Sequence, residues 1–169
     1  KNWFSAIIVS RMIHVLRILG AAAYVCGYPF ILLWLLGSKR VYAAIVVNDE
    51  LLVTKNWLDL HLQWRLPGGG KQSGETDTQA LTREINEELG IRVSGQQVTP
   101  FVQAAQNTKK NYSYSIYFIQ FAEKPLLQPN KFEIIELCWI PLSDLYRHHL
   151  SPELRDCASI LAEQKSVVQ

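Results

Sequence analysis

The chain has 169 residues, enough to bury one sizeable core, and its 17 basic and 15 acidic side chains give a formal net charge of +2. Such a small excess of positive charge argues against strong binding to nucleic acid, and we exclude nucleic acid as a partner. The three cysteines are odd in number and widely separated, so the sequence predicts no disulfide framework.

Residues 1–37 are predicted to form a hydrophobic helical segment that precedes the domain. No charged residue occurs in the 20 positions from Ile18 to Gly37, a run long enough to cross a bilayer as a helix. Upstream, Arg11 and Arg17 share a polar arc opposite apolar side chains, a pattern typical of helices on anionic membranes. We therefore expect a membrane anchor or an interfacial helix that contacts lipid. The alternative is a helix that docks on the domain or on a partner chain, and the chain is compatible with a homodimer.

Residues 38–169 are predicted to form one domain in which helices flank a mixed sheet. Strand-like runs of residues indicate its strands, with the clearest hydrophobic alternation at residues 112–121, and a turn at residues 48–50 joins the first two. A final helix is expected to begin at Ser151-Pro152-Glu153, with serine as its capping residue and proline at its first position. The predicted strands cover residues 41–47, 51–54, 98–105, 112–121 and 134–140, and a short helical turn follows at 141–145.

A glycine-rich turn and an acidic helix lie between the second and third of these strands. Three consecutive glycines precede a helix predicted near residues 77–89, and Gly90 stands where helices commonly end in a left-handed cap. Because side chains three and four residues apart share a helix face, Glu84, Glu87 and Glu88 project within about one quadrant. Such crowding suits oxygen ligands that converge on a hard divalent cation such as Mg²⁺. For three glutamates alone, an ordinary solvated helix face is the alternative interpretation.

The segment from Gly69 to Ile91 resembles the signature of the Nudix hydrolase family. That pattern is glycine, five residues, glutamate, seven residues, then Arg-Glu-aliphatic-any-Glu-Glu-any-Gly-aliphatic. The preceding Trp64-Arg65-Leu66-Pro67 also resembles the family's usual approach, and the resemblance extends over roughly residues 40–165. It implies the α/β/α sandwich of the Nudix fold, with a mixed sheet. The fixed positions are met by Gly69, Glu75, Arg83, Glu84, Ile85, Glu87, Glu88, Gly90 and Ile91.

The resemblance also implies an activity, namely hydrolysis of a diphosphate (pyrophosphate) linkage in a nucleoside diphosphate derivative with Mg²⁺ or Mn²⁺. Such metal ions neutralise phosphate oxygens and help to deprotonate the attacking water. Glu75 and Arg83 are expected to pair and to brace the glycine loop against the helix. The metal ligands implied by position are the carboxylates of Glu84, Glu87 and Glu88 and the backbone carbonyl of Gly69, with Glu75 as a further candidate.

The general base is left open between several glutamates. Some members of the family take it from the signature helix and others from a downstream loop, where Glu133 and Glu136 are the candidates. The same stretch, residues 131–139, reads equally well as a strand whose glutamates face water.

The substrate and the cellular location are the remaining questions. Auxiliary signatures typical of ADP-ribose, NADH, dinucleoside polyphosphate and coenzyme A enzymes are absent from the sequence. The alternatives to a nucleotide hydrolase are a hydrolase of lipid-linked diphosphates such as CDP-alcohols, a non-hydrolysing Nudix module that binds a nucleotide and regulates a partner, and a hydrophobic assembly protein. We expect a membrane-associated protein whose catalytic domain faces the cytoplasm, where nucleotides and free Mg²⁺ are found.

Overall fold

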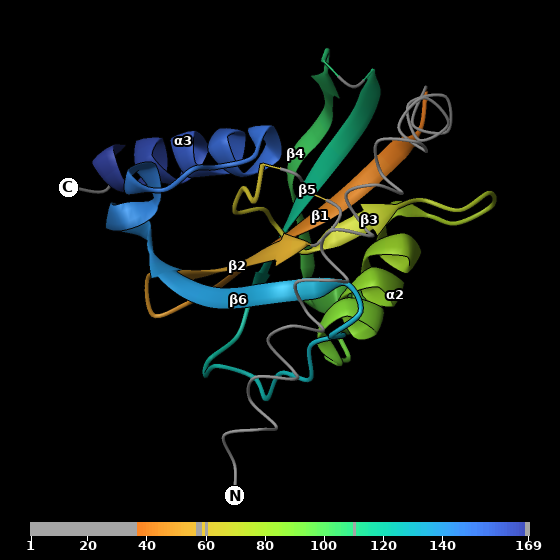
Figure 1. Ribbon diagram of the computed structural model, residues 1–169, viewed down its shortest axis with the longest axis horizontal. Helices are drawn as coiled ribbons and strands as arrows, with labels where there is room; N and C mark the ends of the chain where they lie inside the picture. Colours follow the sequence, from red (N-terminus) through yellow and green to blue (C-terminus); the bar gives the residue numbers. More distant parts are fainter. Residues whose placement is uncertain (1–36, 57–58, 60, 110, 168–169) are drawn as a thin grey trace, which may run out of the picture.

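A computed structural model describes residues 37–56, 59, 61–109 and 111–167 of the chain. Within these residues six strands form one mixed sheet, and two α-helices lie on its opposite faces (Figure 1). The hydrophobic segment predicted at residues 1–37 lies outside the described residues, apart from Gly37, so its helical form stays a prediction.

The sheet has the order β4-β5-β1-β2-β6, and β3 pairs with β1 beside this path. Strand β1 runs parallel to β5 from Lys39, opposite Ser113, to Val46, opposite Gln120. The other strand pairs are antiparallel, so the predicted mixed sheet is confirmed. The strands are β1 (Lys39–Val47), β2 (Glu50–Asn56), β3 (Gly68–Gly70), β4 (Val98–Asn107), β5 (Tyr112–Gln120) and β6 (Ile134–Pro141).

The second edge of β1 is shared between two strands. At its C-terminal end Val46 pairs with Leu51 of β2, and nearer its start Val41 pairs with Gly69 of β3. The three glycines were predicted to be a turn, and the structure shows a short strand instead. Glycine is depleted in strands, so pairing with β1 rather than local preference fixes this conformation. The pairing anchors the glycine segment to the centre of the sheet.

The two α-helices bury apolar side chains against opposite faces of the sheet. Successive residues of β1 alternate between the faces, as the pleat of a strand requires, so Tyr42 and Ala43 enter different cores. Helix α2 (Asp77–Leu89), green in Figure 1, covers one face and α3 (Pro152–Val167), in blue, covers the other. The arrangement is the expected α/β/α sandwich. The buried helix residues are Ala80, Leu81, Ile85 and Leu89 of α2 and Leu154, Cys157, Ala158 and Leu161 of α3.

Local signals set the ends of these helices. A capping box between Thr76 and Gln79 starts α2, and Gly90 ends it at a φ of 69°, in the predicted left-handed cap. Pro152 is the first residue of α3, as predicted, but the hydroxyl of Ser151 has no hydrogen-bond partner and makes no capping bond. Two short 3₁₀ helices, η1 (Gly95–Gln97) and η2 (Leu142–Arg147), complete the described elements, and η2 corresponds to the predicted helical turn.

No helix in the described part of the chain combines the length and the apolar character needed to span a membrane. This finding contradicts the predicted membrane-associated location. The apolar run from Ile18 to Gly37 was read as an anchor from its length and lack of charge alone, and those two features do not distinguish lipid from other apolar surroundings.

Candidate active site

The start of α2 is joined by side-chain contacts to the residue after the glycine strand and to β5. Lys71, just after β3, forms an ion pair of 2.5 Å with Asp77, the first residue of the helix. The hydroxyl of Tyr117 on β5 donates to the other carboxylate oxygen of Asp77 at 2.8 Å. The hydrogen bond from Lys71 is the largest cause of the lowered pKa of Asp77. These contacts fix where α2 begins relative to the sheet.

Arg83 is the centre of a network that joins the loop to the helix. Its Nε and Nη2 donate to the two carboxylate oxygens of Glu75 at 2.8 and 3.0 Å, and Nη2 also donates to the carbonyl of Gly70 at 3.0 Å. The structure thus shows the bracing pair that the family resemblance implies. The hydrogen bonds that Glu75 accepts, first from Arg83 and then from the Gln72 amide, lower its pKa to about 2. Glu75 is therefore ionised at neutral pH.

Two carboxylates of α2 lie directly against the glycine strand. Glu88 is only 3 % exposed, and its Oε2 accepts a hydrogen bond of 2.8 Å from the Gly68 amide. Burial raises the pKa of Glu88 to about 8, and the neighbouring Glu84 adds to that rise. Burial also raises the pKa of Glu84, whose carboxylate packs against Gly69 so closely that a Cβ there would meet Oε2 at 2.5 Å. The absence of a side chain at Gly69 makes room for Glu84, whereas at Gly68 it allows close approach to the backbone of β1, where a Cβ would clash with the Val41 carbonyl oxygen.

The third predicted ligand, Glu87, is more exposed than this pair and shares Arg83 with Glu84. Arg83 Nη1 donates to Glu84 Oε1 at 2.8 Å and to Glu87 Oε2 at 3.1 Å, so one guanidinium bridges the two carboxylates. Among the described residues, no group of three or more His, Cys, Asp or Glu side chains is already arranged to hold a metal ion. The structure therefore does not show the predicted convergence of Glu84, Glu87 and Glu88, because the positive charge between Glu84 and Glu87 comes from Arg83.

The donor set nevertheless fits a hard divalent cation. Mg²⁺ and Mn²⁺ prefer carboxylate and carbonyl oxygens, and these are the groups that face the glycine strand. The charge of Glu84 raises the pKa of Glu88, and the charge of Glu87 raises the pKa of Glu84, so a bound cation would relieve repulsion among these acids. The ligand roles of these glutamates and of the Gly69 carbonyl stay predictions.

Gly69→Ala tests this packing, because the new Cβ must push aside the Glu84 carboxylate, which is the mobile end of a long side chain. We expect the variant to fold with an unchanged melting temperature and to bind Mn²⁺ at least about 10-fold more weakly in a calorimetric titration. Gly95→Ala, the same substitution in η1, is the control and should bind Mn²⁺ like the parent chain. Equal affinity in all three proteins would remove Glu84 from the ligand set.

The two candidate bases take different places in the structure. Glu136 lies on β6 and forms an ion pair of 2.7 Å with Lys55 on β2, with 54 % of its side chain exposed. Glu133 lies in the turn just before β6, close enough to Glu88 for its charge to raise the pKa of Glu88. Only Glu133 of this pair is therefore placed with the acids of α2, and the solvent-facing strand position that the sequence allowed belongs to Glu136.

Two arginines beside the acids were not identified as site residues from the sequence. Arg65 is paired with the buried Glu153 at 3.3 Å, and its charge lowers the pKa of Glu88. Arg40 donates to the hydroxyl of Tyr42 at 3.0 Å, and its charge lowers the pKa of Glu84. For Arg40 the available signal was a charged side chain within β1, the strand that pairs with the glycines. Two cations beside a carboxylate pair are suited to a ligand that carries phosphate groups.

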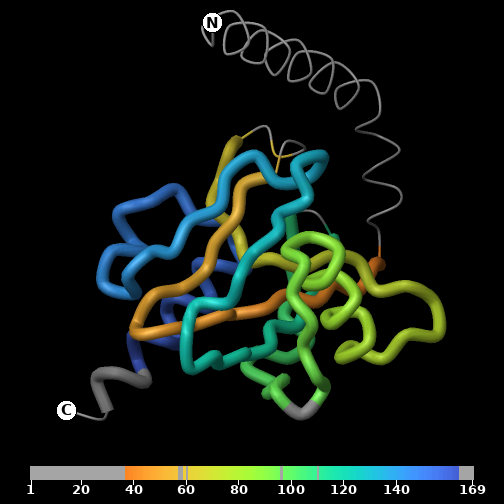
Figure 2. Tube along the Cα trace, turned by 90° about the horizontal axis from the view of Figure 1, so that it is seen from below, coloured from red at the N-terminus to blue at the C-terminus, as the bar shows by residue number. Residues whose placement is uncertain are grey.

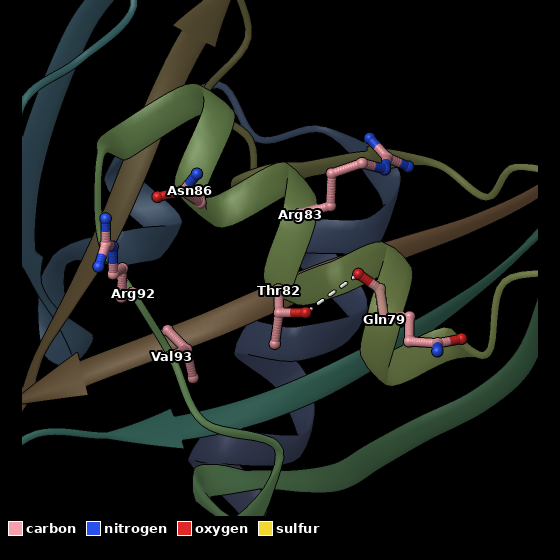
Figure 3. Close-up of a pocket in the computed structure, with 6 residues that line it drawn as sticks. All are labelled: Gln79, Thr82, Arg83, Asn86, Arg92 and Val93. Carbon is pink, nitrogen blue, oxygen red and sulfur yellow. Dashed lines mark hydrogen bonds between the residues drawn. The ribbon is translucent and has the colours of Figure 1, made fainter.

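A separate hollow of about 350 Å³ lies on the outer side of α2 (Figure 3). In Figure 3 the side chain of Arg83 turns away from that of Arg92, and its guanidinium group is the one that binds Glu75 and Glu84. Arg83 thus lines the hollow and also binds the acids of the site. It is lined by Gln79, Thr82, Arg83, Asn86, Arg92 and Val93.

The fold and this site together define a class of protein, the hydrolases that act on acid anhydrides. A glycine strand that leads into an arginine-braced acidic helix, inside an α/β/α sandwich, is typical of that class. The sequence model of the NUDIX domain matches residues 37–159. The chain belongs to the NUDIX family, and it is a pyrophosphohydrolase. Members of this family generally use divalent metal ions.

Individual relatives agree with this assignment. The chain is 32 % identical over 108 residues to nucleoside triphosphatase NudI of Escherichia fergusonii, covering 58 % of this chain and 75 % of that protein. Among solved structures, it resembles the MutT NUDIX hydrolase of Burkholderia pseudomallei with a TM-score of 0.61 and 24 % identity, over 73 % of this chain and 96 % of that one.

A further solved structure was determined with a metal ion. It is a bifunctional NMN adenylyltransferase/ADP ribose pyrophosphatase of Francisella tularensis in complex with AMP and a Mn ion. The TM-score is 0.62 at 21 % identity, over 84 % of this chain and 47 % of that one. At such low identities, both structural likenesses establish the fold alone.

Proposed function

We propose that the chain hydrolyses the diphosphate linkage of a nucleoside diphosphate derivative in a Mg²⁺-dependent reaction. The observation that supports this most directly is the pair of carboxylates, Glu84 and Glu88, packed against the glycine strand with Arg40 and Arg65 beside them. Acids that bind a divalent cation and arginines that bind phosphate oxygens are both required to stabilise charge in phosphoryl transfer. The relative that is a nucleoside triphosphatase supports a nucleotide as substrate.

The acids of α2 are assigned to the metal. Glu84, Glu87 and Glu88 would hold the ion together with the Gly69 carbonyl, and Glu75 is the further candidate. When bound, Mg²⁺ or Mn²⁺ neutralises phosphate charge and lowers the pKa of a coordinated water.

Arg83 fixes the position of the loop before α2 relative to the acids of the helix. Its bidentate pair with Glu75 holds residues 71–76 against α2, and its bond to the Gly70 carbonyl ties that loop to β3. Nη1 uses one carboxylate oxygen of Glu84 and one of Glu87, so the other oxygen of each would be free to bind a cation. Arg83 is therefore proposed to position the site rather than to contact the substrate.

Glu133 is the proposed general base. It lies close enough to Glu88 for its charge to raise the pKa of that proposed metal ligand, and it would accept the proton of a water activated at the metal. Glu136 is engaged with Lys55 on the sheet and is not assigned a catalytic role. Arg40 and Arg65 are proposed to orient the phosphate oxygens for in-line attack.

The test is a substrate screen of the purified chain with Mg²⁺ against nucleotide sugars, dinucleotides, nucleoside triphosphates and CDP-alcohols, with release of phosphate products as the readout. We expect turnover of at least one nucleoside diphosphate derivative and its loss when EDTA removes the metal. Hydrolysis in ¹⁸O-labelled water should place the label on a phosphate product, because water attacks phosphorus. Tight nucleotide binding without turnover would favour the regulatory module over the enzyme.

A further inference from the structure

Asn130 makes an unusual number of hydrogen bonds for a residue in a turn. Its amide N–H donates to the carbonyl of Glu88 at 2.9 Å, which ties the turn to the end of α2. Its carbonyl accepts from the amides of Glu133 and Ile134 at 3.0 and 2.8 Å. Its side-chain Oδ1 accepts from the Phe132 amide at 3.1 Å, and its Nδ2 donates to Glu133 Oε2 at 3.3 Å. One residue therefore contacts both the helix of metal-binding candidates and the candidate base.

The segment before Asn130 is also fastened to the end of α2. The Gln128 amide donates to the carbonyl of Leu89 at 2.8 Å. A Cβ on Gly90 would meet the Cβ of Gln128 at 2.8 Å, so the segment and the helix cap are packed in direct contact. Figure 2 shows the stretch that leads to β6 running beside the green coil of α2. The turn at residues 130–133 is thus carried by the same helix end as Glu88.

We propose that Asn130 is a positioning residue that aims the Glu133 carboxylate at the acids of α2. The inference rests on the proposed function, in which Glu133 is the general base. The two polar atoms of the Asn130 side chain bind different partners. Oδ1 closes the turn through Phe132, as asparagine and aspartate both do in such turns, whereas Nδ2 restrains the carboxylate of Glu133.

This division provides a substitution that separates the two roles. Asn130→Asp retains an oxygen that can accept from the Phe132 amide, so the turn keeps its bond. It replaces the donor to Glu133 by a second carboxylate oxygen, which repels the base instead of holding it. The control is Asn48→Asp, the same change in the exposed turn between β1 and β2.

Turnover is measured at saturating Mg²⁺ with the nucleotide that the parent chain hydrolyses fastest in the screen. We expect Asn130→Asp to lower kcat by about 10-fold or more with KM within about 2-fold, because a misdirected base forfeits part of its contribution. The melting temperature should match that of the parent chain. Asn48→Asp should leave kcat, KM and the melting temperature unchanged.

A double-mutant cycle with Glu133→Gln separates positioning from a general structural effect. If Asn130 acts through Glu133, Asn130→Asp lowers kcat in the parent chain and causes no further loss in the Glu133→Gln variant. Losses that multiply would overturn the inference. In ¹H–¹⁵N spectra, the side-chain amide of Asn130 should shift when Glu133 is changed to glutamine, and an unchanged resonance would also overturn it.

Failure of this inference can be told apart from failure of the base assignment. If Glu133→Gln lowers kcat and Asn130→Asp does not, only the positioning role is overturned. If Glu133→Gln leaves kcat unchanged, Glu133 is not the base, and the proposed function loses that assignment together with the role of Asn130.

Discussion

Glu87→Gln is expected to reduce Mg²⁺-dependent turnover by about 100-fold or more while the chain stays folded. Glu87 has 53 % of its side chain exposed, and its ion pair with Arg83 is 3.1 Å long. Surface pairs of this kind contribute no more than about 1 kcal/mol to stability. The amide keeps the size and shape of the carboxylate, so the change removes little besides the charge offered to the metal.

The measurements are initial rates over a range of Mg²⁺ concentrations and a thermal melt of the metal-free protein. A lost ligand should also raise the Mg²⁺ concentration needed for half-maximal activity. Glu123→Gln removes the same charge from the exposed loop after β5 and serves as the control. If Glu87→Gln retained normal turnover, the ion would be held by Glu84 and Glu88 with other groups. Glu87 would then stay exposed during turnover and would not be a metal ligand.

The signature segment shows how far the sequence predicts this site. Spacing along a helix placed Glu84, Glu87 and Glu88 on one face, and the family pattern assigned the partnership of Glu75 with Arg83. The first depends on spacing within one helix, whereas the second joins a loop residue to the helix and followed from the family pattern alone. Spacing could not predict that Arg83 Nη1 also donates hydrogen bonds to Glu84 and Glu87 and so bridges them. Those bonds depend on the rotamer of one long side chain.

Features that depend on pairing between distant segments were harder to predict. An apolar run identified β1 and hydrophobic alternation identified β5, yet nothing local indicated that three glycines would form β3 against β1. The choice between Glu133 and Glu136 depended on where β6 begins, and a shift of a few residues exchanges their surroundings. Arg40 lies near the acids because Glu84 and Glu88 pack against β3, which pairs with β1, and the charge of Arg65 also acts on Glu88.

The apolar run at the start of the chain led to the wrong location. Composition identifies a segment that avoids water, but it does not identify what covers that segment. The signature helix, by contrast, combines fixed residue types with fixed spacing, and that combination made the family assignment secure. Sequence patterns were therefore reliable here where chemistry restricts the residues and less so where hydrophobicity alone was available.

The metal-free chain is expected to become less stable as the pH rises from about 4.5 to about 8. Glu88 has a pKa of about 8 in the folded chain, against an ordinary value of 4.5, because burial disfavours its charged form. The folded state therefore binds this proton more tightly than the unfolded state. The stabilisation is fully present below pH 4.5 and is lost as the pH rises through 8, with a loss of up to about 5 kcal/mol. Glu84, whose pKa burial also raises, acts in the same direction.

Glu75 contributes in a different pH window and with the opposite sign. Its pKa of about 2 lies below the ordinary 4.5, so its stabilisation is present above pH 4.5 and is lost as the pH falls toward 2. The metal-free protein should thus be most stable near pH 4.5. Urea unfolding between pH 3 and pH 9 in the presence of EDTA measures this profile. Glu88→Gln should remove most of the decline above pH 4.5 and leave the acid side unchanged.

Added Mg²⁺ should reverse the alkaline decline, because a cation binds the ionised carboxylates of the folded chain and not their protonated forms. The gain in unfolding free energy on adding Mg²⁺ is therefore expected to be larger at pH 8 than at pH 5. In Glu88→Gln this difference should shrink. A stability profile that is flat from pH 4.5 to 8 without metal would mean that Glu88 is ionised throughout, with its charge compensated inside the folded chain. The need for a cation to offset two buried acids would then disappear, and Glu88 would serve mainly to hold the Gly68 amide.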